Sequence, residues 1–197
     1  MKLVFATNNQ NKLSEIRSIL SSEIEILSLK EINCNEELPE TNPTLQQNAM
    51  QKARFVFENY GFDCFADDTG LEIDELGGEP GVYSARYSGE HSNAKKNIDK
   101  VLTKLKGNDL RTASFRTVIA LIIKGNEDVF EGICSGNISK LEHGTNGFGY
   151  DPVFIPNGFE KTFAEMTMKE KSCISHRAKA VSKLVAFLNS YKAKATS

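Results

Sequence analysis

One short stretch, residues 65–71 (Phe-Ala-Asp-Asp-Thr-Gly-Leu), most constrains how this chain can fold. The apolar residues Phe62, Cys64, Phe65 and Ala66 predict a short buried strand, which stops at two adjacent carboxylates, Asp67 and Asp68. Neighbouring carboxylates repel each other unless a cation lies between them, and hard oxygen ligands at a strand end suit Mg²⁺ better than zinc. A solvated acidic turn is the alternative, because Asp-Asp-Thr-Gly is also a favourable turn sequence.

The composition excludes several classes of protein. The 197 residues, 40% of them apolar, suffice for a single domain over 1–197 that buries a core. A net charge of −2 gives no indication of a nucleic-acid or membrane partner. Four widely spaced cysteines without a C-x-x-C pair argue against a zinc site and fit a reducing compartment. With no signal-peptide pattern and no membrane-spanning run, we predict a cytoplasmic protein.

A wholly polar turn follows the first predicted strand, residues 3–6, and precedes a helix with an apolar face. The turn consists of Thr7, Asn8, Asn9, Gln10, Asn11 and Lys12. The first N–H groups of a helix are unpaired and its dipole is positive there, so this arrangement predicts an anion site. Capping of the helix by the asparagines alone is the alternative.

A second helix is predicted to start at Asn42-Pro43-Thr44 and to stop at Gly61. Pro43 suits the first helical position, and Thr44 could also form a capping box with Gln47. It leads into the strand that ends at the paired aspartates. The acidic loop before it contains Glu40, which could complete a metal site there. Solvation is the usual state of a loop glutamate and is the alternative.

The strongest strand signal spans residues 112–123, and a turn at 125–126 returns the chain into a partner strand over 128–139. We therefore predict an antiparallel hairpin, whose continuous apolar end is buried on both faces. Ser92 is predicted to cap a helix that follows it, and Ser175 opens the final helix.

Two later segments carry candidate ligand groups. The glycine-rich loop 144–152 allows close approach of backbone to a ligand, and Phe148 and Tyr150 could stack on a flat ring; a packed aromatic turn is equally compatible. His176 and Arg177 lie in the first turn of the final helix, where their charge opposes the helix dipole. Such a local conflict favours a functional site, although a lone histidine is more often structural.

Five separated pieces of the chain together resemble the Ham1/inosine triphosphatase family. They are Thr7-Asn8-Asn9 with Lys12; Glu40-Thr41 ahead of Asn48-Ala49 and Lys52-Ala53; residues 66–71; residues 80–87; and residues 147–152 with Lys171 and Ser175-His176-Arg177. They run in order from end to end of the chain. No single piece is decisive, but the set is highly specific.

The resemblance implies an α/β fold with a long twisted mixed sheet flanked by helices, and two lobes with a central nucleotide cleft. It also implies a homodimer that uses Mg²⁺ to convert a nucleoside triphosphate to its monophosphate and pyrophosphate. The substrates implied are the non-standard purine nucleoside triphosphates ITP, dITP, XTP and dXTP. Donors from His176, Arg177 or loop N–H groups would pair with the 6-keto oxygen and be left unpaired against adenine.

The resemblance also implies a role for individual residues. Thr7, Asn8, Asn9, Gln10, Asn11 and Lys12 would hold the phosphates. Glu40, Asp67 and Asp68 would serve Mg²⁺, with Asp68 also accepting a proton from the attacking water. Thr69 and Lys171 would contact the substrate. Phe148, Gly149, Tyr150, Asp151, His176 and Arg177 would form the base pocket.

Two residues depart from the family pattern. Thr69 stands where many members have Ser and keeps the hydroxyl, whereas Gln47 stands where Glu is common and removes a carboxylate. The rival predictions are a Maf-like pyrophosphatase directed at other modified nucleotides, and a nucleotide-binding module without catalytic activity. The pieces around 148–151 and 175–177 argue against the first, and the intact carboxylates argue against the second.

Overall fold

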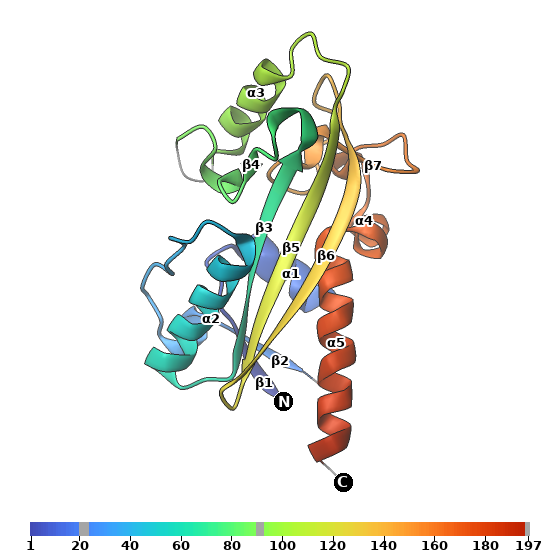
Figure 1. Cartoon of the computed structure of the whole chain (residues 1–197). Coiled ribbons are helices and arrows are strands. Elements are labelled where there is room, and N and C mark those ends of the chain that lie inside the picture. The colour runs from blue at the N-terminus through green and yellow to red at the C-terminus, as the bar shows by residue number, and fades with distance from the viewer. Residues whose placement is uncertain (20–23, 90–92, 196–197) are drawn as a thin grey trace. The chain divides into compact units, whose positions relative to one another are not determined.

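The computed structural model describes residues 1–19, 24–89 and 93–195 (Figure 1). It divides into two compact units. The first unit contains Met1–Asp68, Thr117–Gly132 and Arg177–Ser197, and the second contains Thr69–Arg116 and Ile133–His176. Asp68 and His176, two predicted site residues, are thus the last residues of their segments.

The described strands are β1 (Lys2–Phe5), β2 (Glu25–Ser28), β3 (Cys64–Ile73), β4 (Pro80–Gly81), β5 (Thr112–Ile123), β6 (Asn126–Ile138) and β7 (Phe154–Pro156). They form one sheet in the order β2-β1-β3-β5-β6-β7, with β4 paired to β3. β1 is parallel to both β2 and β3, whereas β4 is antiparallel to β3 and β7 is antiparallel to β6. The predicted α/β fold with a mixed sheet is confirmed.

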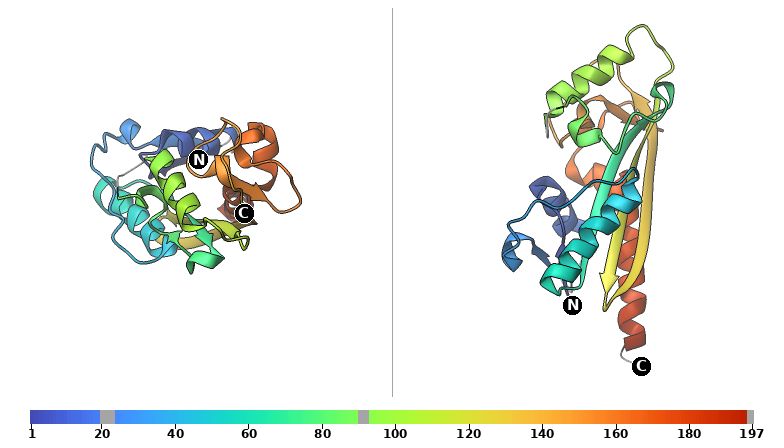
Figure 2. Two further views of the ribbon diagram at one scale, coloured as in Figure 1. Left: turned by 90° about the horizontal axis from the view of Figure 1, so that it is seen from above. Right: turned by 60° about the vertical axis from the view of Figure 1, so that its left-hand side comes forward.

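Three helices belong wholly or mainly to the first unit: α1 (Gln10–Ile19), α2 (Leu45–Tyr60) and α5 (His176–Ala195). The core of this unit joins the apolar faces of α1 and α5 to β1, β3 and β5. α2 lies beside the first part of β3 (Figures 1 and 2), where the Cys64 thiol donates to the Ala53 carbonyl, 3.1 Å away. Gly61 ends α2 in a left-handed conformation, as predicted. Of the two predicted starts, the cap at Thr44 is confirmed, because its side chain accepts from the Gln47 N–H and the helix begins at Leu45, after Pro43.

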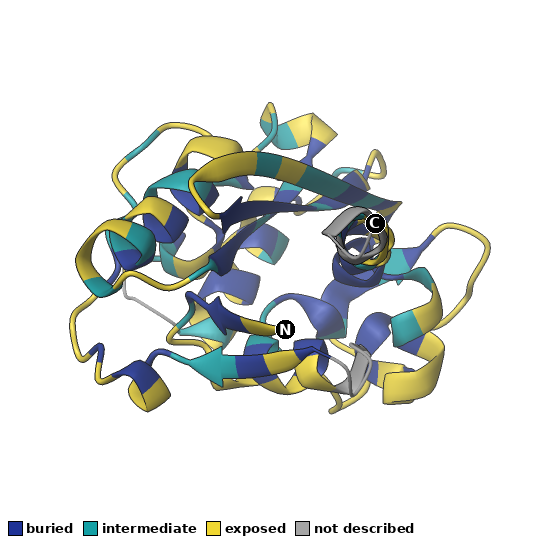
Figure 3. Ribbon diagram, turned by 90° about the horizontal axis from the view of Figure 1, so that it is seen from below, coloured by how far each residue is buried: buried dark blue, intermediate teal, exposed yellow. Residues whose placement is uncertain are grey.

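The hairpin prediction also holds. β5 and β6 are neighbours joined by a turn at Lys124-Gly125, one residue before the predicted turn, and β6 begins at Asn126 rather than at residue 128. In the first unit, residues 117–123 of β5 are all buried, whereas β6 keeps exposed positions, as the colours of Figure 3 show. The continuous apolar end of β5 is therefore covered on both faces, and the more polar β6 is not.

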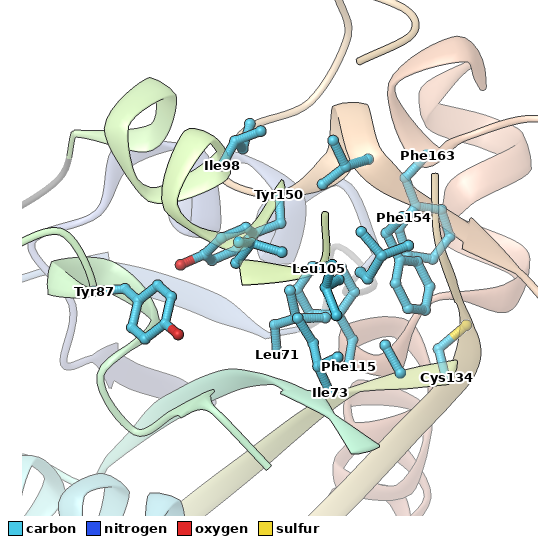
Figure 4. Packing of buried hydrophobic residues seen from close by; sticks show 14 of the residues in the cluster. Leu71, Ile73, Tyr87, Ile98, Leu105, Phe115, Cys134, Tyr150, Phe154 and Phe163 are labelled. Carbon is cyan, nitrogen blue, oxygen red and sulfur yellow. The ribbon is translucent and has the colours of Figure 1, made fainter. Parts of the chain in front are cut away.

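The second unit contains α3 (Ala94–Lys104) and α4 (Met168–Ile174). Its core is rich in aromatic rings, and Figure 4 shows Phe115, Phe154 and Phe163 packed together. The Phe115 and Phe154 ring centroids are 4.7 Å apart. The predicted cap of α3, Ser92, lies outside the described residues; the N-cap is Asn93, whose side chain accepts from the Lys96 N–H. No described helix is both long and apolar enough to span a bilayer.

Candidate active site

The polar turn at residues 7–12 is the first element of the candidate site. The Asn9 side-chain oxygen accepts from the N–H groups of Asn11 and Lys12 at 3.0 and 3.1 Å. The Thr7 hydroxyl accepts from the Asn9 N–H at 3.2 Å. Asn9 therefore caps α1, while Asn8, Gln10 and Asn11 are exposed. The capping alternative describes Asn9, whereas Asn8, Gln10 and Asn11 are open to solvent.

A pocket of about 390 Å³ adjoins this turn within the first unit. It is lined by Thr7, Asn8, Gln10, Ser28, Leu29, Lys30, Cys34, Asn35, Glu36 and Glu37. These residues follow the carboxyl ends of β1 and β2, which run parallel. Crevices at the carboxyl ends of parallel strands are where α/β folds bind their ligands.

Asp67 is surrounded by cations. Its Oδ1 accepts from the Lys12 ammonium at 3.0 Å, and its Oδ2 lies 3.4 Å from Nε of Arg177. The Arg177 guanidinium also pairs with the Glu15 carboxylate through Nη1. Asp67, Glu15 and Arg177 are all buried, and so their charges depend on one another rather than on water.

Asp68 belongs to a second group of charges, arranged around Lys52. The Lys52 ammonium pairs with a Glu40 oxygen, lies 3.8 Å from Oδ1 of Asp68 and donates to the Asp67 carbonyl at 2.7 Å. Lys52 is only 4% exposed. One buried cation thus contacts Glu40 and Asp68, two of the three carboxylates that the family resemblance assigned to Mg²⁺.

The two adjacent aspartates have opposite pKa shifts. Burial alone would raise the pKa of Asp67, but the charges of the cations around it, Lys12 first, outweigh burial and hold the pKa well below its usual range. Burial raises the pKa of Asp68 despite the attraction of Lys52. Burial also lowers the pKa of Lys12. Asp67 is therefore a fixed anion, while Asp68 is the better proton acceptor of the two.

The two carboxylates that contact Lys52 could bind Mg²⁺ together with a phosphate ligand. Mg²⁺ is commonly held by one or two carboxylates together with substrate phosphates and water, and Glu40 and Asp68 supply two such carboxylates. Among the described residues no three acidic, histidine or cysteine side chains form a metal cluster. The residues thus suit a metal ion that arrives with a phosphate ligand, and they do not suit a zinc site made by protein alone.

The second unit holds another buried ion pair. Oδ2 of Asp151 accepts from the Lys171 ammonium at 2.7 Å and from the Phe148 N–H at 2.8 Å. The Lys171 ammonium lies 5.1 Å from the centre of the Phe148 ring. Gly147 has φ 76°, and a Cβ there would come within 2.0 Å of Oδ2 of Asp151, so this turn requires glycine.

Tyr150 and His176 lie deeper in the second unit. The Tyr150 hydroxyl donates to the Ser84 carbonyl at 2.9 Å, and the His176 ring stacks on Phe115 with centroids 4.5 Å apart. Both side chains are buried. These contacts match the packed-turn and structural-histidine alternatives, and recognition of a base by either residue stays a prediction.

The structure therefore brings the predicted residues into two groups. In the first unit these are Lys12, Glu40, Asp67, Asp68 and Arg177; in the second they are Phe148, Asp151 and Lys171. Thr69 and Gly149 are half-buried in the second unit. Arg177 was assigned to the base pocket, but its described contacts are with Asp67 and Glu15. Its assignment to the base stays a prediction that these contacts do not favour.

Lys52 and Glu15 had no predicted role. A signal for Lys52 was present, because it occupies the helix face that Ala49, Ala53 and Val56 bury. Lysine is almost never fully buried unless it is paired. Glu15 lies beside the buried Ile16 on α1, and nothing local distinguishes it from a solvated glutamate.

Comparisons with known proteins agree on one family. The Ham1 family model matches residues 3–187. The dITP/XTP pyrophosphatase of Christiangramia forsetii is 58% identical, covering 96% of this chain and all of that protein. The dITP/XTP pyrophosphatase of Bacillus subtilis is 46% identical, covering 92% of this chain and 93% of that protein.

Solved structures give the same result. The Staphylococcus aureus Ham1 protein superposes with a TM-score of 0.88 at 37% identity, covering 97% of this chain and 100% of that one. A HAM1 protein from Coxiella burnetii also gives 0.88, at 36% identity, covering 96% of this chain and 99% of that one. Sequence and fold therefore agree along nearly the whole chain, which belongs to the Ham1 family.

Proposed function

We propose that this protein hydrolyses non-standard purine nucleoside triphosphates (ITP, dITP, XTP and dXTP) to the monophosphate and pyrophosphate. The observation that carries the proposal is the group formed by the half-buried Glu40 with the buried Asp68 and Lys52, in a chain 58% identical to a dITP/XTP pyrophosphatase. Two carboxylates and a lysine supply what phosphoryl chemistry needs from a protein, which is charge neutralisation and a proton acceptor.

The first unit would bind the polyphosphate. Thr7, Asn8, Asn9, Gln10 and Asn11 offer polar groups at the start of α1, and the Lys12 ammonium lies beside them. The pocket next to this turn gives room for phosphate groups. Lys52 would add a second cation.

Glu40 and Asp68 would hold Mg²⁺ together with the phosphates. When bound, the ion would neutralise part of the polyphosphate charge and withdraw electrons from the reacting phosphorus. Asp67 was predicted as a further ligand, but its two oxygens face Lys12 and Arg177. We therefore favour a positioning role for Asp67.

The proposed reaction is a single in-line displacement. Water attacks the α-phosphorus and Asp68 accepts its proton, which the raised pKa of this carboxylate favours. The new O–P bond forms as the bond from the α-phosphorus to the bridging oxygen breaks. Pyrophosphate leaves with the electron pair of that bond.

The second unit would recognise the base. Lys171, Asp151 and the Phe148 ring lie together there, with Thr69 and Gly149 only half-buried. A donor aimed at the 6-keto oxygen would accept hypoxanthine and xanthine and reject the 6-amino group of adenine, because a buried donor would be left unpaired. The protein is further proposed to be a cytoplasmic homodimer, on the family resemblance, and sedimentation tests the dimer.

Product analysis tests the proposal directly. The protein is incubated with Mg²⁺ and ITP, beside ATP and GTP, and the products are separated by ion-exchange chromatography. IMP and pyrophosphate, with ATP and GTP nearly untouched, are expected. IDP and phosphate would overturn the point of attack, and equal turnover of ATP would overturn the base assignment. A parallel incubation with EDTA should abolish turnover if Mg²⁺ is required.

A further inference from the structure

A ring of alternating charges in the first unit includes Glu15, to which the proposed function gives no role. Lys12 pairs with Asp67, Asp67 pairs with Arg177, and Arg177 pairs with Glu15. Lys12 and Glu15 both belong to α1, three residues apart, and so the ring begins and ends on the same helix. Residues at this spacing lie on one face of a helix.

The ring ties the polar turn to the sheet. Asp67 comes from β3 and Arg177 from the first turn of α5, while both ends of the ring come from the first turns of α1. The side chains of Asp67 and Arg177 are 0% and 2% exposed, and that of Glu15 is 10% exposed. Charges buried to this degree need fixed partners, because water does not replace a partner that is lost.

We infer that Glu15 is a positioning residue for phosphate binding. Its carboxylate satisfies one side of the Arg177 guanidinium, which leaves the other side to hold Oδ2 of Asp67. Oδ1 of Asp67 accepts from the Lys12 ammonium and so fixes it at the end of the polar turn. The inference rests on the proposed function, because Lys12 is assigned there to the phosphates.

Loss of the Glu15 charge has a definite consequence. Arg177 keeps its positive charge and its contact with Oδ2 of Asp67. The guanidinium then draws Asp67 toward itself and away from Lys12. A cation displaced by about 1 Å from its working position can cost on the order of 100-fold in rate.

The experiment uses substitutions that separate charge from volume. Glu15→Gln keeps the size and removes the charge, whereas Glu15→Asp keeps the charge and shortens the side chain. The matched control is Glu127→Gln, because Glu127 forms an exposed pair with Arg54 in the same unit, at 2.6 and 2.8 Å. For each variant, kcat/KM is measured with ITP and Mg²⁺, and the Kd of inorganic tripolyphosphate is measured by calorimetry without Mg²⁺.

We expect Glu15→Gln to lower kcat/KM about 30-fold and to weaken tripolyphosphate binding about tenfold. Glu15→Asp should restore both values to within about fivefold of the parent protein, since it restores the charge that holds Arg177. Glu127→Gln should leave both unchanged. If Glu15 only fills space, Glu15→Gln will stay closer to the parental kcat/KM and Kd than Glu15→Asp, and the inference is wrong. A folded Glu15→Gln protein with parental kcat/KM and Kd also overturns it.

The design keeps the inference separate from the proposed function. If the parent protein fails to turn over ITP while tripolyphosphate binding still depends on the Glu15 charge, the proposed reaction falls and the positioning role stands. If Glu15→Gln fails to fold, the double variant with Arg177→Met removes both buried charges and takes its place. It should fold and bind tripolyphosphate more weakly than the parent protein; parental affinity in it overturns the inference.

Discussion

The two units bury charge in different ways. In the first, two groups of side chains alternate cations with carboxylates, around Asp67 and around Lys52. In the second, the buried pair of Lys171 and Asp151 lies among aromatic rings and a backbone N–H. The first arrangement fits a polyanion and its metal ion, because its charges can be shared with a ligand. The second fits a flat, nearly neutral ring with a few directed polar groups.

The largest expected effect concerns the carboxylate assigned to proton transfer. Asp68→Asn keeps the shape of the side chain and removes its basicity, so kcat with ITP should fall by about 10²–10⁴-fold. Tripolyphosphate binding should change far less, because Lys12 and Lys52 remain. Steady-state kinetics and calorimetry check the two halves of this prediction. A near-parental kcat would contradict the assignment of Asp68 as the proton acceptor, and the first unit would then have no assigned catalytic group.

Removal of Lys52 tests whether the charges of the first unit depend on one another. Lys52→Met leaves Glu40 and Asp68 without their shared cation, and unpairing a buried charge costs about 3–5 kcal/mol of unfolding free energy. Urea denaturation measures the loss. Added Mg²⁺ should recover more stability in this variant than in the parent protein, because the freed carboxylates bind it.

The neighbouring Arg54 provides the control for that experiment. It lies on the same helix, its side chain is 54% exposed, and it pairs with Glu127 at the surface. Arg54→Met should leave stability unchanged within error, with or without Mg²⁺. An equal loss in both variants would show that burial of Lys52 contributes nothing special.

The helix α2 also shows how far the sequence could predict the structure. Gly61 was predicted correctly as the end of α2, and Thr44 was one of its two predicted starts, because capping depends on neighbouring residues. The partners of Lys52 and Arg177 were not predicted, because Arg177 and Asp67 are 110 residues apart and only the fold brings them together. Periodicity marks a position as buried without saying what it contacts. The resemblance to a family supplied the candidate site, and it placed Arg177 with the base.

A smaller effect is expected in the second unit. Asp151→Asn can still accept from the Phe148 N–H, but it removes the charge beside Lys171. We expect kcat/KM for ITP to fall about tenfold, with pyrophosphate still the product and the ratio of ITP to ATP turnover reduced, because an unpaired buried polar group carries the discrimination. The control is Asp109→Asn in the same unit, since Asp109 pairs with Lys140 and both side chains are largely exposed. An unchanged ratio of ITP to ATP turnover in Asp151→Asn would show that this group of residues does not recognise the base.

The smallest expected effect separates a structural from a ligand-binding tyrosine. Tyr150→Phe removes the hydroxyl that donates to the Ser84 carbonyl and keeps the buried ring. It should cost about 1 kcal/mol of unfolding free energy, the usual value of one net hydrogen bond, and change kcat/KM less than about threefold. Tyr83→Phe is the matched control, because the Tyr83 side chain is exposed in the same unit. If Tyr150→Phe instead lowers kcat/KM tenfold at parental stability, the hydroxyl contacts the substrate, and base recognition in the second unit extends from Lys171 and Asp151 into its aromatic core.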